Sequence, residues 1–415
     1  MRRALHRYRL AIAEGLIALG VFVVVAILAF GSSSGHRGRG AVAPQRPASA
    51  RAGGRSLLDA LAPDLEQSTG GSVTTSATTP PNAPVQLSLP LTRAVAQLFL
   101  VGFAGTDAAS PLLGRLRARD WAGVVLDVSN YVSPTQLTTL TALIRAAVKA
   151  AGHTPALVVA RQAGGDASAL PGLPPEPEPL QSAGGNPKVA DRQALDSARE
   201  LRSIGVSAVI APDADLSYQG GPAAGHSFGS DPALVTRMVL AAVRGYREAG
   251  LIPILGPFPG EGAASSDPNT AVATVGLSAA QLRSRDEAPF AAAVSDAPAI
   301  QLSDALFAAI DPATPASLSP AAIALLRHGL RYRGVIVTGD LTAATAATGT
   351  SVGAAAVAAL KAGADLLYIS GDAAAQEQAY DDVLVALRHG QLSERSIAES
   401  AARVLALKRS YGLLG

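Results

Sequence analysis

Apolar runs alternate with helical patterns along residues 89–415 of the chain. Eight runs have the length and composition of short buried strands, at 98–103, 123–128, 156–160, 208–211, 252–256, 300–303, 334–338 and 364–369. Helical patterns lie between them, for example at 133–150, 187–203, 232–249, 278–295 and 319–328. Most of the runs are continuously apolar at their centres instead of alternating, which is typical of parallel strands covered on both faces. Eight strands with eight crossovers predict an α/β fold, a (β/α)8 TIM-type barrel.

An open doubly wound sheet is the alternative fold for the same alternation of strands and helices. It is the weaker interpretation, because no glycine-rich nucleotide loop follows an early strand. The last helical pattern, at 394–411, keeps an amphipathic register and stops at Gly412, a residue type that favours helix ends.

The first 88 residues have a different pattern. Four arginines within residues 1–9 precede an apolar run, and the stretch 10–31 is long enough to cross a bilayer. We interpret 1–31 as a cytoplasmic tail and an uncleaved transmembrane signal anchor, with a cleaved signal peptide as the alternative. Residues 32–88 are rich in Gly, Ser, Ala, Pro and Thr, which predicts a low-complexity linker. The basic tail predicts that residues 89–415 lie on the extracytoplasmic side, although arginines also follow the span.

Composition excludes several classes of function. The net charge is only +2, so the chain lacks the electrostatic signature of a nucleic-acid-binding protein. The absence of cysteine excludes disulfides, thiolate metal sites and a cysteine nucleophile. The six histidines are scattered without ligand-like spacing, so we predict no metal and no cofactor.

Polar residues follow four of the predicted strands, at the end of a barrel where function is located. They are Arg161 after the third strand, Asp215 and His226 after the fourth, Glu261 and Asp267 after the fifth, and Asp340 after the seventh. Arg161 is a candidate for binding an anionic ligand, or for pairing with Asp215 or Asp340. For Asp215 we expect a hydrogen bond within its own loop, and for His226 the role of a capped loop residue instead of a metal ligand.

Several segments carry a resemblance to a known family. They include 98–105, 123–130, Phe258-Pro259-Gly260, Asp311-Pro312, the run 315–319, Ala362-Gly363-Ala364-Asp365 and the tail 403–408. In this order and spacing they resemble glycoside hydrolase family 3, in its β-N-acetylhexosaminidase branch, over roughly residues 89–415. The resemblance implies a retaining enzyme that removes terminal N-acetylglucosamine from cell-wall fragments. It also implies an Asp nucleophile after the seventh strand and a His acid/base, paired with an Asp, after the fifth.

The positions that match the family's functional residues differ in this chain. The nucleophile position is Gly339, and Asp340 comes one residue later. A shift of one residue along a strand turns the side chain to the opposite face, so Asp340 would need a local bulge to take that role. Glu261 and Asp267-Pro268-Asn269 stand where the family has histidines, and His226 and Arg161 replace substrate-gripping residues.

These departures leave three hypotheses. The first is a barrel of family 3 type that is catalytically impaired and binds a cell-wall glycan or muropeptide, with a membrane contact through residues 10–31. The second is an active glycosidase in which Glu261 is the acid and Asp340 the nucleophile or base, with Arg161, Asp215, His226 and Asp267 on the substrate. The third is a protein-interaction module of the cell envelope, in which the barrel mouth binds no sugar. In the first and third hypotheses Asp340 is a helix N-cap or a residue of the barrel mouth.

Overall fold

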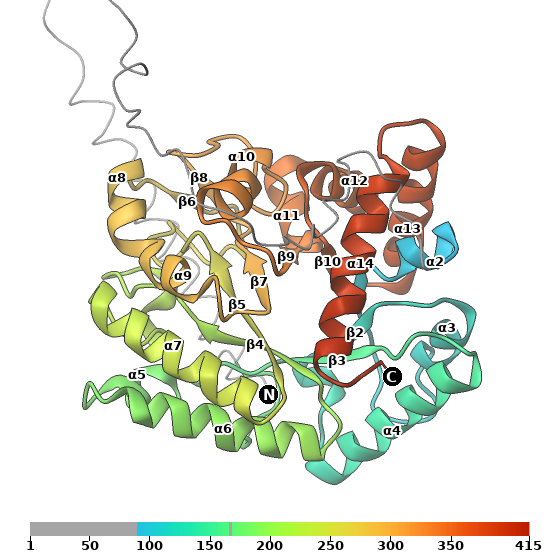
Figure 1. The fold of residues 1–415 in the computed structure, drawn as a ribbon, viewed down its shortest axis with the longest axis horizontal. Helices are drawn as coiled ribbons and strands as arrows, with labels where there is room; N and C mark the ends of the chain where they lie inside the picture. Colours follow the sequence, from blue (N-terminus) through green and yellow to red (C-terminus); the bar gives the residue numbers. More distant parts are fainter. Residues whose placement is uncertain (1–88, 166–167, 415) are drawn as a thin grey trace, which may run out of the picture. The chain divides into compact units, whose positions relative to one another are not determined.

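The computed structural model describes residues 89–165 and 168–414. Eight parallel strands form a closed barrel in the centre of this part of the chain, surrounded by helices (Figure 1). The barrel strands are β1 (Phe99–Gly102), β2 (Gly123–Leu126), β3 (Leu157–Arg161), β4 (Ala208–Asp213), β5 (Ile252–Phe258), β7 (Ala299–Leu302), β9 (Val335–Asp340) and β10 (Leu366–Ile369). Pairing of β1 with β10, with Phe99 opposite Leu367, closes the ring. The predicted barrel and its eight strands are therefore confirmed.

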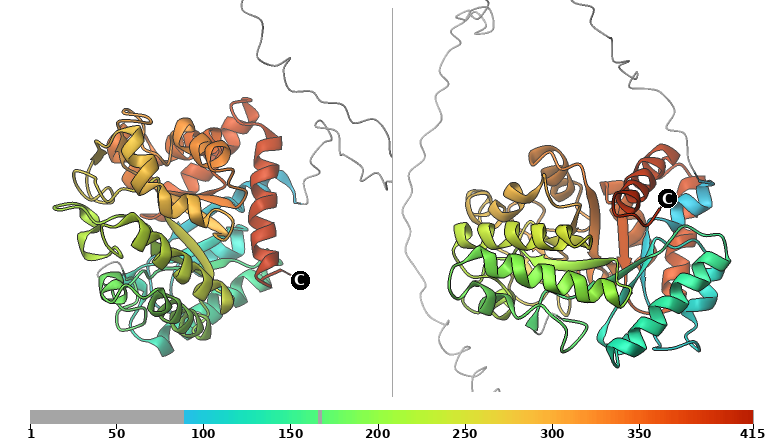
Figure 2. Two further views of the ribbon diagram at one scale, coloured as in Figure 1. Left: turned by 60° about the vertical axis from the view of Figure 1, so that its left-hand side comes forward. Right: turned by 60° about the horizontal axis from the view of Figure 1, so that its bottom comes forward.

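Helices precede the first barrel strand, lie between consecutive strands and follow the last one. They are α2 (Leu91–Ala96), α3 (Leu112–Ala118), α4 (Pro134–Ala150), α5 (Glu178–Ser182), α6 (Pro187–Ser203), α7 (Pro232–Glu248), α8 (Ala279–Gln281), α9 (Ala288–Ala293), α10 (Pro320–Ala324), α11 (Leu341–Thr348), α12 (Val352–Ala362), α13 (Ala373–Arg388) and α14 (Glu394–Ser410). Figure 2 shows α6 and α7 side by side along one flank. Local sequence explains where the long helices begin, because Ser133, Asn186 and Asp231 each cap a helix whose first residue is proline.

Alternate residues of each strand enter two different cores. Leu100, Val125, Val159 and Ile254 belong to a cluster inside the barrel, whereas their strand neighbours, such as Phe99, belong to the layer between strands and helices. Both faces of each strand are thus buried, which explains why the strand sequences are apolar throughout. Residues from α14 join the cluster inside the barrel, and so this helix helps to close the end opposite the loops that follow the strands.

A small second sheet shapes the loops on one side of the barrel mouth. Strands β6 (Thr274–Val275) and β8 (Leu306–Phe307) pair in parallel, and so connect the segment after β5 with the segment after β7. A separate apolar cluster, which includes Val275, Leu282 and Phe307, packs beneath this pair. The sequence pattern did not predict this element, because each strand is only two residues long.

The predicted anchor at 10–31 and the linker at 32–88 lie outside the described residues. Within the part of the chain that the structure describes, no single helix has both the length and the apolar character needed to cross a bilayer. One sharply bent pair, α11 with α12, passes that test by length and composition alone.

Candidate active site at the mouth of the barrel

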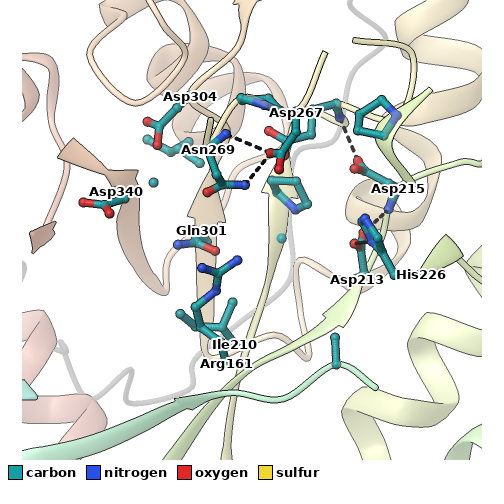
Figure 3. Close-up of a pocket in the computed structure, with 18 of the residues that line it drawn as sticks. Arg161, Ile210, Asp213, Asp215, His226, Asp267, Asn269, Gln301, Asp304 and Asp340 are labelled. Carbon is teal, nitrogen blue, oxygen red and sulfur yellow. Dashed lines mark hydrogen bonds and ion pairs between the residues drawn. The ribbon is translucent and has the colours of Figure 1, made fainter. Parts of the chain in front are cut away.

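A cavity of about 540 Å³ opens at the ends of the barrel strands that lead into the loops. Side chains from β3, β4, β5, β7, β9 and β10 and from the loops after them line it (Figure 3). All six candidate residues from the sequence are among its lining: Arg161, Asp215, His226, Glu261, Asp267 and Asp340. The structure therefore brings all six candidates together around one cavity, where their contacts can be compared with those expected.

The position that carries the family's nucleophile has no room for a side chain. Gly339 lies near the end of β9 and lines the pocket. A Cβ atom added there would lie 2.5 Å from Oδ1 of Asp304 and closer still to Oδ2 and Cγ of the same carboxyl group. Real Cβ atoms do not approach other atoms so closely, so Asp304 occupies the space into which a nucleophile at 339 would extend.

Asp304 is a pocket residue that the sequence analysis missed. It follows Leu302 at the end of β7 by two residues and is 7% exposed. Burial raises the pKa of its carboxyl group well above the usual value, and the Ser317 hydroxyl partly opposes this effect. Negative charge on Asp340 and Glu261 raises the same pKa further, so Asp304 lies within electrostatic reach of both. The sequence signal that could have identified Asp304 was an acidic residue shortly after the sixth barrel strand.

Asp340 caps the helix that follows β9. Its Oδ1 accepts hydrogen bonds from the backbone N–H groups of Thr342 and Ser370, both at 3.0 Å. The pairing of β9 with β10 shifts register between Val337 and Asp340, which is the kind of bulge that the sequence argument required. The bulge interrupts the alternation of the strand, and so Gly339 and Asp340 both line the pocket instead of facing opposite sides. Asp340 is therefore both a helix N-cap and a residue of the barrel mouth, the two positions that the sequence suggested for it apart from a nucleophile.

Glu261 is fixed on the loop after β5 by contacts to neighbouring segments. The Ser303 hydroxyl donates a hydrogen bond to its Oε2 at 2.5 Å, and its own backbone N–H donates to Oδ1 of Asp215 at 2.7 Å. Burial raises the pKa of Glu261 to about 7, although the hydrogen bond from Ser303 lowers it. Asp215 is 2% exposed, and its carboxylate accepts this hydrogen bond from the loop after β5, not from its own loop as the sequence suggested.

A histidine–aspartate pair forms the wall opposite Asp304 in the view of Figure 3. Asp213, the last residue of β4, contacts Nδ1 of His226 at 2.8 Å through its Oδ2. This hydrogen bond is the main reason why the pKa of His226 is raised. The other oxygen of Asp213 accepts from the backbone N–H of Asp215 at 2.8 Å, so the pair is held in place by the chain itself. The sequence named His226 but not its partner.

Arg161 and Asp267 complete the lining. Arg161 ends β3, and within the described residues its guanidinium makes no hydrogen bond or ion pair, so the expected pairing with Asp215 or Asp340 is wrong. Asp267 accepts hydrogen bonds from the backbone and the side-chain amide of Asn269, each at 2.9 Å, on the exposed rim. Across the residues that the structure describes, no cluster of three or more His, Asp and Glu side chains is arranged to hold a metal ion.

Comparison with known proteins identifies the family of this chain. A model of the glycosyl hydrolase family 3 N-terminal domain matches residues 91–407. The chain belongs to glycoside hydrolase family 3. A beta-hexosaminidase of Stenotrophomonas maltophilia is 31% identical over 288 residues, which cover 66% of this chain and 83% of that protein. Beta-hexosaminidase LpqI of Mycobacterium tuberculosis is 31% identical over 362 residues, which cover 82% of this chain and 91% of that protein.

A solved family 3 structure has the same fold. The beta-N-acetylglucosaminidase from Paenibacillus sp. str. FPU-7 superposes with a TM-score of 0.75 and 32% sequence identity. The match covers 79% of this chain and 64% of that one, so this chain spans slightly less than two thirds of that structure. The predicted family and its hexosaminidase-like character are therefore confirmed.

The family 3 pocket of this chain is rich in acids. Six carboxylates line it, from Asp213, Asp215, Glu261, Asp267, Asp304 and Asp340, against one guanidinium and one imidazole. A retaining glycosidase needs a nucleophile and an acid/base about 5–5.5 Å apart on either side of the scissile bond. In this pocket four of the six acids accept hydrogen bonds from backbone N–H groups, namely Asp213, Asp215, Asp267 and Asp340. The arrangement can bind a ligand by hydrogen bonds and charge, and it can exchange protons at Glu261 and His226.

Proposed function

We propose that this family 3 barrel binds the terminal hexosamine unit of a cell-wall glycan or muropeptide at its mouth and is impaired in hydrolysis. The observation that carries the proposal is the packing at position 339. No carboxylate can extend from that position while Asp304 fills the adjacent space. Removing the nucleophile of a covalent mechanism typically lowers the rate by orders of magnitude, because the remaining groups cannot replace it.

Retention of the pocket supports the binding part of the proposal. Its volume of about 540 Å³ falls in the range of small-ligand sites. Its lining carries both charged and amide side chains, including Arg161, Gln301 and Asn269, which can hydrogen-bond sugar hydroxyls. A barrel that had lost every ligand would have no reason to keep such groups around an open cavity. The apolar run at 10–31 supports a position outside the cytoplasm, held at the membrane by a single span.

Turnover and binding are tested on the same sample of the full chain. We expect hydrolysis of p-nitrophenyl N-acetyl-β-glucosaminide to be at least about 1,000-fold slower than that of LpqI assayed beside it. We expect saturation-transfer NMR to detect contact between the chain and muropeptides. Robust turnover would reject the impairment. Loss of all saturation transfer would favour the protein-interaction module.

A second candidate is hydrolysis by relocated groups, with Glu261 as acid and Asp340 as nucleophile or base. One observation favours it, because burial raises the pKa of Glu261 to about 7, a value suited to a general acid at neutral pH. It requires Asp340 to leave its two backbone donors in order to attack. Under this candidate Asp340→Asn abolishes hydrolysis, and a variant with unchanged turnover excludes it.

A further inference from the structure

A second cavity, of about 470 Å³, lies at the end of the barrel opposite the mouth. Ala156 and Ser207 line it and come directly before β3 and β4, and Gly250 lines it two residues before β5. None of the residues that line this basal cavity also lines the pocket at the mouth. In barrels of this type catalysis is located at the mouth, so a ligand in the basal cavity would have a separate role.

The floor of the basal cavity is apolar. Ile144 and Val148 from α4, Val158 from β3 and Val206 before β4 form it, and each is at most 5% exposed. Leu413, which follows α14, also lines the cavity and packs against the cluster inside the barrel. Such a floor favours an apolar group, because contact with it removes apolar surface from water.

The exposed edge of the basal cavity is basic. Arg145 and Lys149 from α4 and Arg202 from α6 line it, and no aspartate or glutamate belongs to the lining. Among the residues that the structure describes, none of these three cations forms an ion pair. Their charges are therefore available to an anion that enters from solvent.

Backbone carbonyl groups position the two guanidinium groups at this edge. Nη1 of Arg202 donates to the carbonyl of Ala249 at 2.5 Å, and Nη1 of Arg145 approaches the carbonyl of Gly205 at 3.5 Å. Glycine leaves room for both groups, because a Cβ at Gly205 would collide with Nη1 of Arg145 and one at Gly250 would lie 3.1 Å from Nη1 of Arg202. A guanidinium has five N–H donors, so most of them remain free for a ligand.

We propose that the basal cavity binds a phosphate monoester that carries an apolar group, with the phosphate at the basic edge and the apolar group on the floor. Arginine suits this anion, because its planar guanidinium can donate two parallel hydrogen bonds to phosphate oxygens. Lys149 adds a third positive charge at the same edge. A lipid headgroup and a soluble phosphate ester share this chemistry. The proposal does not depend on glycan binding at the mouth.

Three ligands separate the contributions of the edge and the floor. They are hexyl phosphate, inorganic phosphate and hexanol, each titrated calorimetrically into the full chain in nanodiscs of phosphatidylcholine, with empty nanodiscs as the blank. At about pH 7.5 a phosphate monoester is largely doubly charged. We expect hexyl phosphate to bind at least about 10-fold more tightly than either of the other two. Each further CH₂ of the chain should strengthen binding by up to about fourfold until the floor is covered.

Two double variants with the same change in charge locate the bound phosphate. Arg145→Gln with Arg202→Gln removes both guanidinium groups from the edge, and we expect it to weaken binding of hexyl phosphate about 10-fold or more. Arg192→Gln with Arg199→Gln removes two exposed arginines of α6 that pair with Asp196 outside the cavity, and should change the affinity by less than about twofold. Thermal unfolding shows that folded proteins are compared.

A change of lipid identifies the source of the phosphate. The titration with hexyl phosphate is repeated in nanodiscs that contain phosphatidic acid, which is a phosphate monoester, and in nanodiscs that contain phosphatidylglycerol, which is an anionic diester. Weaker apparent binding with phosphatidic acid alone supports the site and assigns it to a lipid headgroup. Equal binding in both supports the site and assigns it to a soluble ester.

Three results would overturn the proposal. If hexyl phosphate does not bind, the basal cavity is not a site for this class of ligand. If inorganic phosphate or hexanol binds as tightly as hexyl phosphate, the basic edge and the apolar floor do not act on one ligand. If the two double variants lose the same affinity, the phosphate responds to overall charge and not to the cavity. Each of these results leaves glycan binding at the mouth unaffected.

Discussion

The two ends of the barrel differ in how well their buried charged side chains are paired. At the end away from the pocket, Asp365 is completely buried, and its two oxygens are shared among Arg327, Arg403, Ser400 and the backbone N–H of Ile336. At the mouth, acids outnumber cations, and Oδ1 of Asp304 has no partner among the described residues. A buried charge that is fully paired serves the stability of the fold, whereas the acids at the mouth have few cations with which to pair.

Lys408 at the closed end follows the same rule. It is completely buried, and its Nζ donates to Oε1 of Gln97 at 2.7 Å. The amide of Gln97 in turn donates to Asp120, which Arg93 also contacts. Burial lowers the pKa of Lys408 to about 7, and the negative charge of Asp120 partly opposes that effect. Even this cation, which burial disfavours strongly, is held by a chain of polar partners.

We expect the largest loss of stability from removing the buried carboxylate of Asp365, at the end of the barrel opposite the pocket. Asp365→Ala leaves the partly buried Arg327 without its carboxylate and removes the acceptor of Ile336 N–H. We expect a loss of about 3–5 kcal/mol in the free energy of unfolding, as for other broken buried ion pairs. Urea denaturation measures it, and Asp381→Ala on the surface of α13 is the control, with a change within about 0.5 kcal/mol. An equally small effect for Asp365→Ala would contradict the assignment of stability to this end.

We expect an intermediate loss of stability from adding a side-chain atom at position 339 in the barrel mouth. Gly339→Ala places a Cβ against the Asp304 carboxyl group, and overpacking of this kind typically costs about 1–3 kcal/mol. Combining it with Asp304→Ala removes the collision, so the loss from Gly339→Ala should largely disappear in the Asp304→Ala background. A double-mutant cycle from denaturation curves measures this coupling. Additive losses would show that the two positions do not share the space.

The smallest effect concerns the helix cap at the mouth. Asp340→Ala removes the acceptor for Thr342 and Ser370 and should cost about 1 kcal/mol. Asp340→Asn keeps an oxygen at the cap and should change stability by only a few tenths of a kcal/mol. Denaturation of both variants under the same conditions measures the difference. Equal losses would mean that the charge of Asp340, and not its capping oxygen, matters at this position.

The fold could be predicted from the sequence because the composition of each strand reflects how deeply that strand is buried. Runs such as 156–160 and 252–256 are apolar at every position, which is typical of strands buried on both faces. The capping role of Asp340 was also predictable, since its backbone donor Thr342 is two residues away. The Asp215 carboxylate instead accepts from Glu261 in another loop, which local pattern does not reveal.

The parts of the site that sequence reasoning missed depend on side chains that meet across the mouth. Asp304 and Gly339 belong to different strand ends, 35 residues apart, and their shared space is visible only in three dimensions. The same reason explains why the sequence did not reveal that Asp213 pairs with His226, or that Arg161 has no hydrogen-bond or ion-pair partner among the described residues. Local pattern identifies which residues reach the pocket, but it does not determine which of them contact one another.

The contact between residue 339 and Asp304 also sets a condition for redesigning this pocket. Gly339→Asp alone would place a second carboxyl group where that of Asp304 already lies, so the Asp304 side chain would have to move. A variant that places an acid at 339 should therefore also carry a smaller residue at 304.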